Sequence, residues 1–133
     1  MTSVSCTDFC RVMSVTYAEI QDHLEAHPAI KGVYDMKATY VGPNRIRMKA
    51  EIDMDGSVIA QDYLSLVDKT YIRSQSDFIH SNSSSFDRAD KMRDILTEHI
   101  NGGVDHVGKE IDTIEASIKQ KFPQIKHVDL EIL

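Results

Sequence analysis

Residues that could bind a metal ion occur in three groups, the first of which contains the chain's two cysteines. Cys6 and Cys10 lie four residues apart near the N-terminus. This spacing would place two thiolates on one face of a helix, where a metal could bind both. No second pair follows, and two cysteines do not make a disulfide framework. We therefore expect a flexible, reduced segment without a site.

A histidine pair forms the second group. His23 and His27 are also four residues apart, a spacing that puts two imidazoles on the same helix face. Pro28 ends the helix directly after the second histidine, and one pair supplies only two ligands. We expect a solvated or capping role for both side chains.

The third group, His99, Asp105 and His106, surrounds the glycine pair Gly102-Gly103. These side chains could line a metal or proton site, but a polar helix face beside a kink explains them with fewer assumptions. We therefore predict no metal site and no cofactor.

Catalysis would need a nucleophile or base with a partner at a fixed spacing. The candidates lie in segments that we expect to be flexible or on a helix surface, and none has such a partner: Cys6, Cys10, His80, His99 and His106. We expect that the protein is not an enzyme.

Chain length and net charge narrow the possible classes of protein and ligand further. At 133 residues the chain allows one domain, which can bury about two-thirds of its unfolded surface. With 15 Lys and Arg against 21 Asp and Glu, its net charge is −6, which argues against nucleic acid as a ligand. No run approaches the ~18 apolar residues of a membrane span, and no signal peptide is evident. We expect the chain alone to be soluble, without inserting into a membrane.

The elements that must position these residues begin with a hairpin. Two alternating runs, 33–41 and 45–56, flank the turn Gly42-Pro43-Asn44 and predict half-buried antiparallel strands. With Val41 opposite Arg45, the expected pairs on the apolar face are Tyr34 with Ile52, Met36 with Ala50, Ala38 with Met48 and Tyr40 with Ile46.

The polar face of this hairpin should bring like charges together. The same register puts Lys37 opposite Lys49 and Asp35 opposite Glu51, which is unfavourable unless diagonal pairs compensate. We expect a solvated face held by those diagonals, or a surface that meets a partner.

The remaining elements surround the hairpin. We expect residues 1–13 to be a flexible lead-in to a single domain over 14–133. A capping box at Thr16 predicts a helix over 17–26. Within 57–86 the patterns are weaker: apolar residues from Val58 to Val67 suggest a short amphipathic helix, and those from Tyr71 to Ile79 a second weak element. Apolar steps of three and four then predict helices near 87–100 and 104–121, broken at Gly102-Gly103. Alternation over 126–133 predicts a third strand. The class is α/β: an α-β-β-α-β open sandwich, with a three-stranded sheet and the helices on one face.

Three stretches of this sequence resemble a known family. They are the helix and link over 15–35, the strand Arg45 to Gly56, and the terminal His-Val-Asp-Leu-Glu-Ile-Leu of 127–133. Together they resemble the cytoplasmic C-terminal domain of cation diffusion facilitator transporters, in the zinc transporter nine branch. The resemblance implies a metallochaperone-like, ferredoxin-like fold that pairs as a homodimer and couples to a membrane transport domain exchanging zinc for protons.

The resemblance also implies where regulatory zinc ligands would lie. In metal-sensing members they come from all three strands, at positions that fall on Tyr34, Lys49 and Glu131 here. Tyrosine and lysine are poor zinc ligands, and an ammonium repels a divalent ion. We therefore expect the regulatory zinc sites to be absent.

The resulting hypothesis is a non-catalytic regulatory or dimerisation domain of a zinc transporter at an intracellular membrane, with mitochondria as the branch's setting. This chain alone, without the membrane helices, would not transport zinc. The alternative is a freestanding soluble protein-interaction module.

Overall fold

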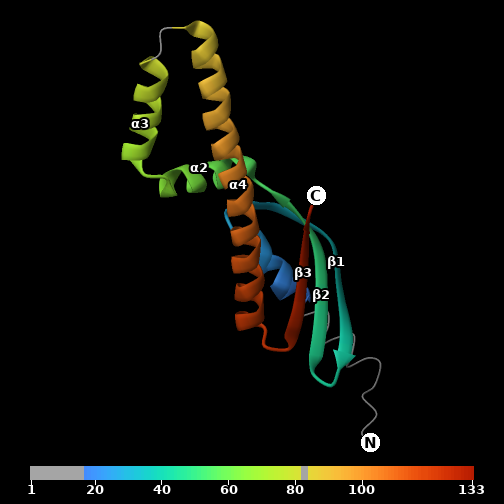
Figure 1. The fold of residues 1–133 in the computed structure, drawn as a ribbon. Coiled ribbons are helices and arrows are strands. Elements are labelled where there is room, and N and C mark those ends of the chain that lie inside the picture. Colours follow the sequence, from blue (N-terminus) through green and yellow to red (C-terminus); the bar gives the residue numbers. More distant parts are fainter. Residues whose placement is uncertain (1–16, 82–83) are drawn as a thin grey trace, which may run out of the picture. The chain divides into compact units, whose positions relative to one another are not determined.

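The computed structural model describes residues 17–81 and 84–133. Its elements are a helix over 17–25, strands β1 (Ile30–Gly42) and β2 (Arg45–Met54), helices α2 (Gly56–Leu66), α3 (Lys69–His80) and α4 (Ser85–Lys121), and strand β3 (Ile125–Ile132). They form two compact units (Figure 1). The sheet unit contains the described residues up to Asp55 together with Ile111–Leu133, and the helical unit is Gly56–Glu110. Helix α4 contributes to both.

The sheet unit has three strands in the order β1-β2-β3. β1 and β2 are antiparallel, and β3 is parallel to β2. One face of the sheet packs against the helix over 17–25 and the C-terminal turns of α4. The buried cluster contains Ile20, Leu24, Ile30, Ile46, Met48, Ala50, Ile52, Ile114, Ile118, Phe122, Ile125 and Leu130. The α/β class, the three-stranded sheet and the helices on one face are confirmed.

The hairpin register is partly as predicted. Ala38 pairs with Met48, Tyr40 with Ile46 and Lys37 with Lys49. The pairs predicted nearer the start of β1 are wrong, because an irregularity lies between Tyr34 and Lys37. At the turn, Gly42 rather than Val41 pairs with Arg45.

This irregularity is a β-bulge at Asp35 and Met36, where Asp35 has a φ of 42°. One extra residue on β1 reverses which face each preceding side chain occupies. Tyr34 therefore pairs with Glu51 instead of Ile52 and is 53% exposed, while Val33 packs against the core. The bulge also keeps Asp35 from facing Glu51.

Helix α4 corrects a second prediction. The break expected at Gly102-Gly103 is absent, since α4 runs without interruption from Ser85 to Lys121. The two glycines differ in their surroundings. A Cβ on Gly103 would meet nothing within 4 Å, whereas one on Gly102 would overlap the Tyr63 ring, 2.6 Å from Cζ. Gly102 thus makes room for an aromatic ring rather than ending the helix.

In the helical unit, the short amphipathic helix expected within 57–86 is α2, and the second weak element, whose type the sequence left open, is helix α3. Asp68 caps α3, because its carboxylate accepts a hydrogen bond from the Thr70 N–H at 2.8 Å. Only Ile59, Gln75 and His106 are buried among the described residues of this unit. Its helices therefore leave much apolar surface exposed.

Candidate functional site

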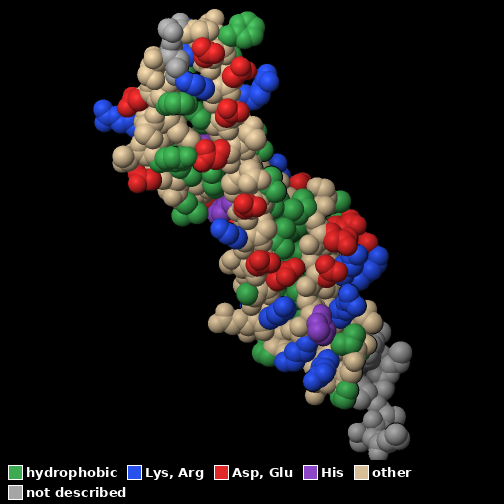
Figure 2. Space-filling view, in the orientation of Figure 1, with side chains coloured by type: hydrophobic (Ala, Val, Ile, Leu, Met, Phe, Trp, Pro, Cys, Tyr) green, Lys and Arg blue, Asp and Glu red, His purple; other side chains and the backbone are tan. Residues whose placement is uncertain are grey.

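The face of the sheet opposite the helices carries charges that change sign along β2. Arg45, Arg47 and Lys49 follow the hairpin turn, and Glu51 and Asp53 lie further along the same face. β3 places His127, Asp129 and Glu131 beside Arg47, Lys49 and Glu51. Figure 2 shows acidic and basic groups side by side over this unit. The open face is therefore basic near the turn and acidic at its other end.

Two ion pairs lie on this face. Lys49 Nζ is 2.6 Å from Glu131 Oε1, and Lys37 Nζ is 2.7 Å from Asp35 Oδ2. The hydrogen bond to Glu131 raises the pKa of Lys49, and the charges of Glu131, Asp129 and Glu51 act in the same direction. The pKa of Lys37 is raised by its hydrogen bond to Asp35. Both lysines are thus held as cations.

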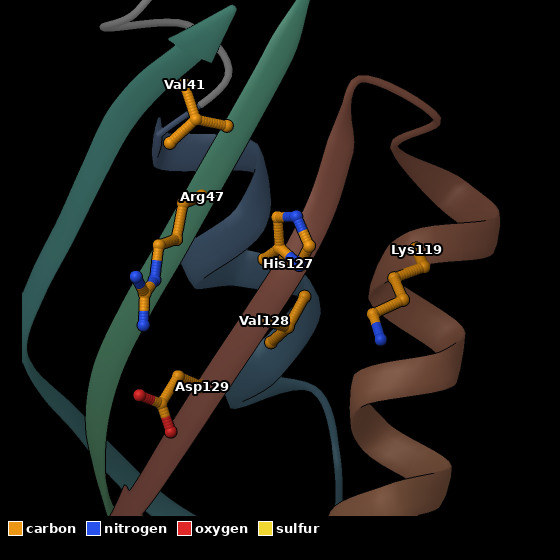
Figure 3. Close-up of a pocket in the computed structure, with 6 residues that line it drawn as sticks. All are labelled: Val41, Arg47, Lys119, His127, Val128 and Asp129. Atoms are coloured by element: carbon orange, nitrogen blue, oxygen red, sulfur yellow. The ribbon is translucent and has the colours of Figure 1, made fainter.

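Beside these pairs lies a cavity of about 430 Å³ lined by Val41, Arg47, Lys119, His127, Val128 and Asp129. Figure 3 shows Arg47 on β2, His127 and Asp129 on β3, and Lys119 approaching from α4. No ion pair joins Arg47 or Lys119 to another described residue. A neighbouring cavity of about 380 Å³ shares Arg47 and Asp129 and adds Lys37 and Lys49. The sequence patterns missed this grouping, because Lys119 reaches β3 only through the fold.

At the three positions where the family resemblance implied zinc ligands, the structure places an exposed tyrosine and an ion pair. Tyr34 is exposed and pairs with Glu51. Lys49 and Glu131 are bonded to each other, so an ammonium occupies the space beside the carboxylate. Since a cation there repels a divalent ion, these residues do not fit a bound zinc.

His23 and His27 line one cavity of about 330 Å³ but have different partners. Ser117 Oγ donates to the Ile114 carbonyl at 2.8 Å, so it accepts from His23 Nε2 at 3.0 Å. His27 Nδ1 accepts from the Ala29 N–H at 3.2 Å. Burial lowers the pKa of His23, with contributions from Lys121 and His27. His27 thus accepts a hydrogen bond from the turn that follows the helix over 17–25.

His99 belongs to a hydrogen-bonded chain in the helical unit. The Gln75 amide oxygen can only accept, so His99 Nε2–H donates to it at 2.8 Å, and Nδ1 accepts from the Tyr63 hydroxyl at 3.3 Å. The Gln75 amide donates to Glu98 at 3.3 Å, and Tyr71 donates to the same carboxylate at 2.6 Å. Sequence patterns did not reveal this hydrogen-bonded network, since its members come from three helices.

His106 and Asp105 do not join His99 in one site. His106 is 9% exposed, and its Nε2 lies 3.8 Å from Glu110 Oε1 without a hydrogen bond. Asp105 is exposed. His80 Nδ1 contacts the Ser76 carbonyl of its own helix at 2.8 Å.

Over residues 17–81 and 84–133, no three His, Cys, Asp or Glu side chains come together to hold a metal ion. Cys6, Cys10 and the capping residue Thr16 lie outside the described residues. None of the described helices is both long enough and apolar enough to cross a membrane.

Comparison with known proteins gives clear relatives. No protein-family model matches the chain. It is 34% identical over 110 residues to "Proton-coupled zinc antiporter SLC30A9, mitochondrial" of Xenopus laevis and 31% identical to the Homo sapiens protein of that name, in each case over 83% of this chain and 18% of the relative. It is 29% identical over 114 residues to "Metal tolerance protein C4" of Arabidopsis thaliana, over 86% of this chain and 24% of the relative.

Two variants of "MamM CTD" are similar solved structures, with TM-scores of 0.48 and 0.47 and identities of 13% and 14%. Each match covers 92% of this chain and 95% of that chain. The chain spans about a fifth of the length of the curated zinc antiporters that it matches. These relatives confirm the resemblance predicted from the sequence: the chain is a homologue of cation diffusion facilitator proteins and corresponds to one segment of their zinc antiporters.

Proposed function

We propose that this chain serves a zinc transporter as a non-catalytic regulatory and dimerisation domain that pairs without bound zinc. Its partners would be a second copy and the membrane domain of the transport protein. By analogy with relatives named as mitochondrial, its setting would be a mitochondrial membrane. The observation that carries the proposal is the Lys49–Glu131 ion pair on the open face of the sheet.

The Lys49–Glu131 ion pair supports pairing without zinc because the lysine brings a positive charge to this face. The ammonium of Lys49 lies among Glu131, Asp129 and Glu51, whose charges all raise its pKa. Carboxylates in such a group would otherwise attract a divalent ion. The lysine supplies a permanent cation in its place, so this face needs no metal to offset its acidic groups.

The charge gradient supports pairing of two copies through the same face. A two-fold axis brings the same patch of both copies together. If the axis lies between the two sheets and runs across β2, the strands of the two copies are antiparallel. The basic half, with Arg45 and Arg47, then faces the acidic half of the partner, with Glu51 and Asp53. Complementary charges of this kind favour one orientation over others.

Charge reversal tests this surface. Arg47→Glu should place an acidic group opposite the acidic half of the partner and weaken self-association at least about tenfold. The added substitution Glu51→Arg, which reverses the gradient, should restore it. Arg73→Glu is the matched control, because Arg73 is an exposed arginine on α3 in the helical unit.

Sedimentation equilibrium over a wide range of protein concentration measures these constants. Low-salt buffer should strengthen association and high salt should weaken it, since exposed charges are screened. Equal association of the wild-type chain and the Arg47→Glu variant would refute pairing through the open face.

A further inference from the structure

One side of α4 in the helical unit is an exposed apolar face. The 3.6-residue period of a helix places its members within one stripe. Phe86, Met92, Leu96, Ile100 and Val104 are 82%, 42%, 52%, 67% and 65% exposed. Ala89, on the same stripe, is also exposed. We call these six residues the α4 apolar face.

The adjacent side of α4 already has a packing partner. Ile95 and His99 line a cavity of about 290 Å³ together with residues of α2 and α3, and His99 is bonded to Tyr63 and Gln75. Met92, at one edge of the α4 apolar face, also lines this cavity, whereas the other five residues of the face do not. Figure 2 shows hydrophobic side chains at the surface of the unit. Exposed apolar patches of this kind mark interaction surfaces more often than chance.

The size of the face is sufficient for a weak specific contact. With the exposed fractions above, the four residues from Met92 to Val104 leave on the order of 400 Å² accessible, which is the size of the largest apolar patch on a typical soluble monomer. They span about 18 Å of helix, or three turns. A partner covering them would bury a small interface by the standards of stable complexes.

Acidic residues border the face along one side. Asp87, Asp90, Asp94 and Asp105 follow the same helical period, displaced from the apolar stripe. All four are exposed, and within 17–81 and 84–133 none forms an ion pair. The one charged residue inside the stripe is Arg93. The border therefore offers a row of carboxylates to whatever covers the apolar face.

We propose that the α4 apolar face binds an amphipathic helix of a partner protein, with lysine or arginine residues flanking its apolar stripe. Met92, Leu96, Ile100 and Val104 are spaced by four residues, so they form one of the ridges through which helices pack. Interlocking two such ridges gives a crossing angle of about −50°. The basic flank of the partner would then lie over the aspartate row.

The aspartate row also disfavours a second copy of this chain as the occupant. In an antiparallel pair of identical helices, corresponding flanks face each other, so the carboxylates of both copies would meet. Like charges at such flanking positions oppose pairing. Complementary charge therefore favours a basic partner helix.

The probe for this proposal is a synthetic 18-residue helical peptide with leucine on one face and lysine on its flanks. Its matched control carries glutamate in place of each lysine. Fluorescence anisotropy at moderate salt should show binding of the lysine peptide and at least about tenfold weaker binding of the glutamate peptide, because the aspartate row repels it.

Variants locate the binding surface. Leu96→Ser with Ile100→Ser should weaken binding of the lysine peptide at least about tenfold, since central apolar contacts dominate such interfaces. Leu66→Ser is the matched control, because Leu66 is 73% exposed on α2. Asp90→Asn with Asp94→Asn should reduce the preference for lysine over glutamate while helical content, measured by circular dichroism, stays unchanged.

Two results would overturn the proposal. One is equal binding of both peptides, or binding that the Leu96 and Ile100 substitutions leave unchanged. The other is self-association of the chain that those substitutions abolish, which would make a second copy the occupant.

Discussion

The substitutions Gly102→Ala and Gly103→Ala, at neighbouring positions of α4, should have opposite effects on the stability of the helical unit. Alanine is favoured over glycine by about 1 kcal/mol inside a helix. A Cβ on Gly103 meets nothing within 4 Å, so Gly103→Ala should stabilise the helical unit by up to about 1 kcal/mol. A Cβ on Gly102 would lie 2.6 Å from Tyr63 Cζ and 2.8 Å from Cε2, which is closer than real contacts allow.

The cost of this overlap can be bounded. Overpacking of a well-filled site typically costs about 1–3 kcal/mol. Offset by the helix-propensity gain, Gly102→Ala should destabilise the unit by about 0–2 kcal/mol. The two variants should therefore differ by about 1–3 kcal/mol, although they change adjacent residues in the same way. The Tyr63 hydrogen bond to His99 should also be strained.

Native-state hydrogen exchange of α4 amides measures both effects within the helical unit. A double-mutant cycle with Tyr63→Ala isolates the contact. Removing the ring should turn Gly102→Ala into a stabilising change of about the same size as Gly103→Ala. If Gly102→Ala and Gly103→Ala are equal while Tyr63 is present, the packing of Tyr63 against Gly102 is wrong.

Three further predictions concern the sheet unit and the metal. Leu24 is fully buried beneath the sheet. Leu24→Ala should lower the free energy of unfolding, measured with urea, by about 2–5 kcal/mol. A loss below about 1 kcal/mol would contradict the place of Leu24 in the core. Burial lowers the pKa of His23, so the unfolded chain binds the proton more readily and stability should fall as pH drops below about 6.5. His23→Gln should flatten that part of the profile, and an imidazole pKa above 6.5 by NMR would reverse the sign. Isothermal titration of the metal-stripped Cys6→Ser, Cys10→Ser variant with zinc should give only heats of dilution, whereas binding that His23→Ala with His27→Ala removes would reveal a site beside the helix over 17–25.

Local patterns predicted the elements of the sheet unit well. Strict alternation located β1, β2 and β3, and the three-to-four spacing located α4. These patterns succeed because one buried face imposes the period of each element. The pairs of Ala38 with Met48 and of Tyr40 with Ile46 were correct for the same reason, whereas the pair predicted at the turn itself was not.

The errors came from features that depend on distant residues or on one backbone angle. The bulge at Asp35 needs a positive φ, and an aspartate gives a weaker signal for it than a glycine would. The pattern around Gly102 predicts a helix break because Tyr63, whose ring fills the space beside Gly102, lies far away in the sequence. Lys119 joins Arg47 and His127 only after β3 pairs with β2. Such groupings are properties of the tertiary fold.

The proposed pairing of two copies without zinc can be tested by sedimentation equilibrium of the wild-type chain. One series contains a chelator and the other contains a small excess of zinc. We expect a monomer–dimer equilibrium with the same constant in both series. A chain that stays monomeric throughout, or that pairs only when zinc is present, would contradict it.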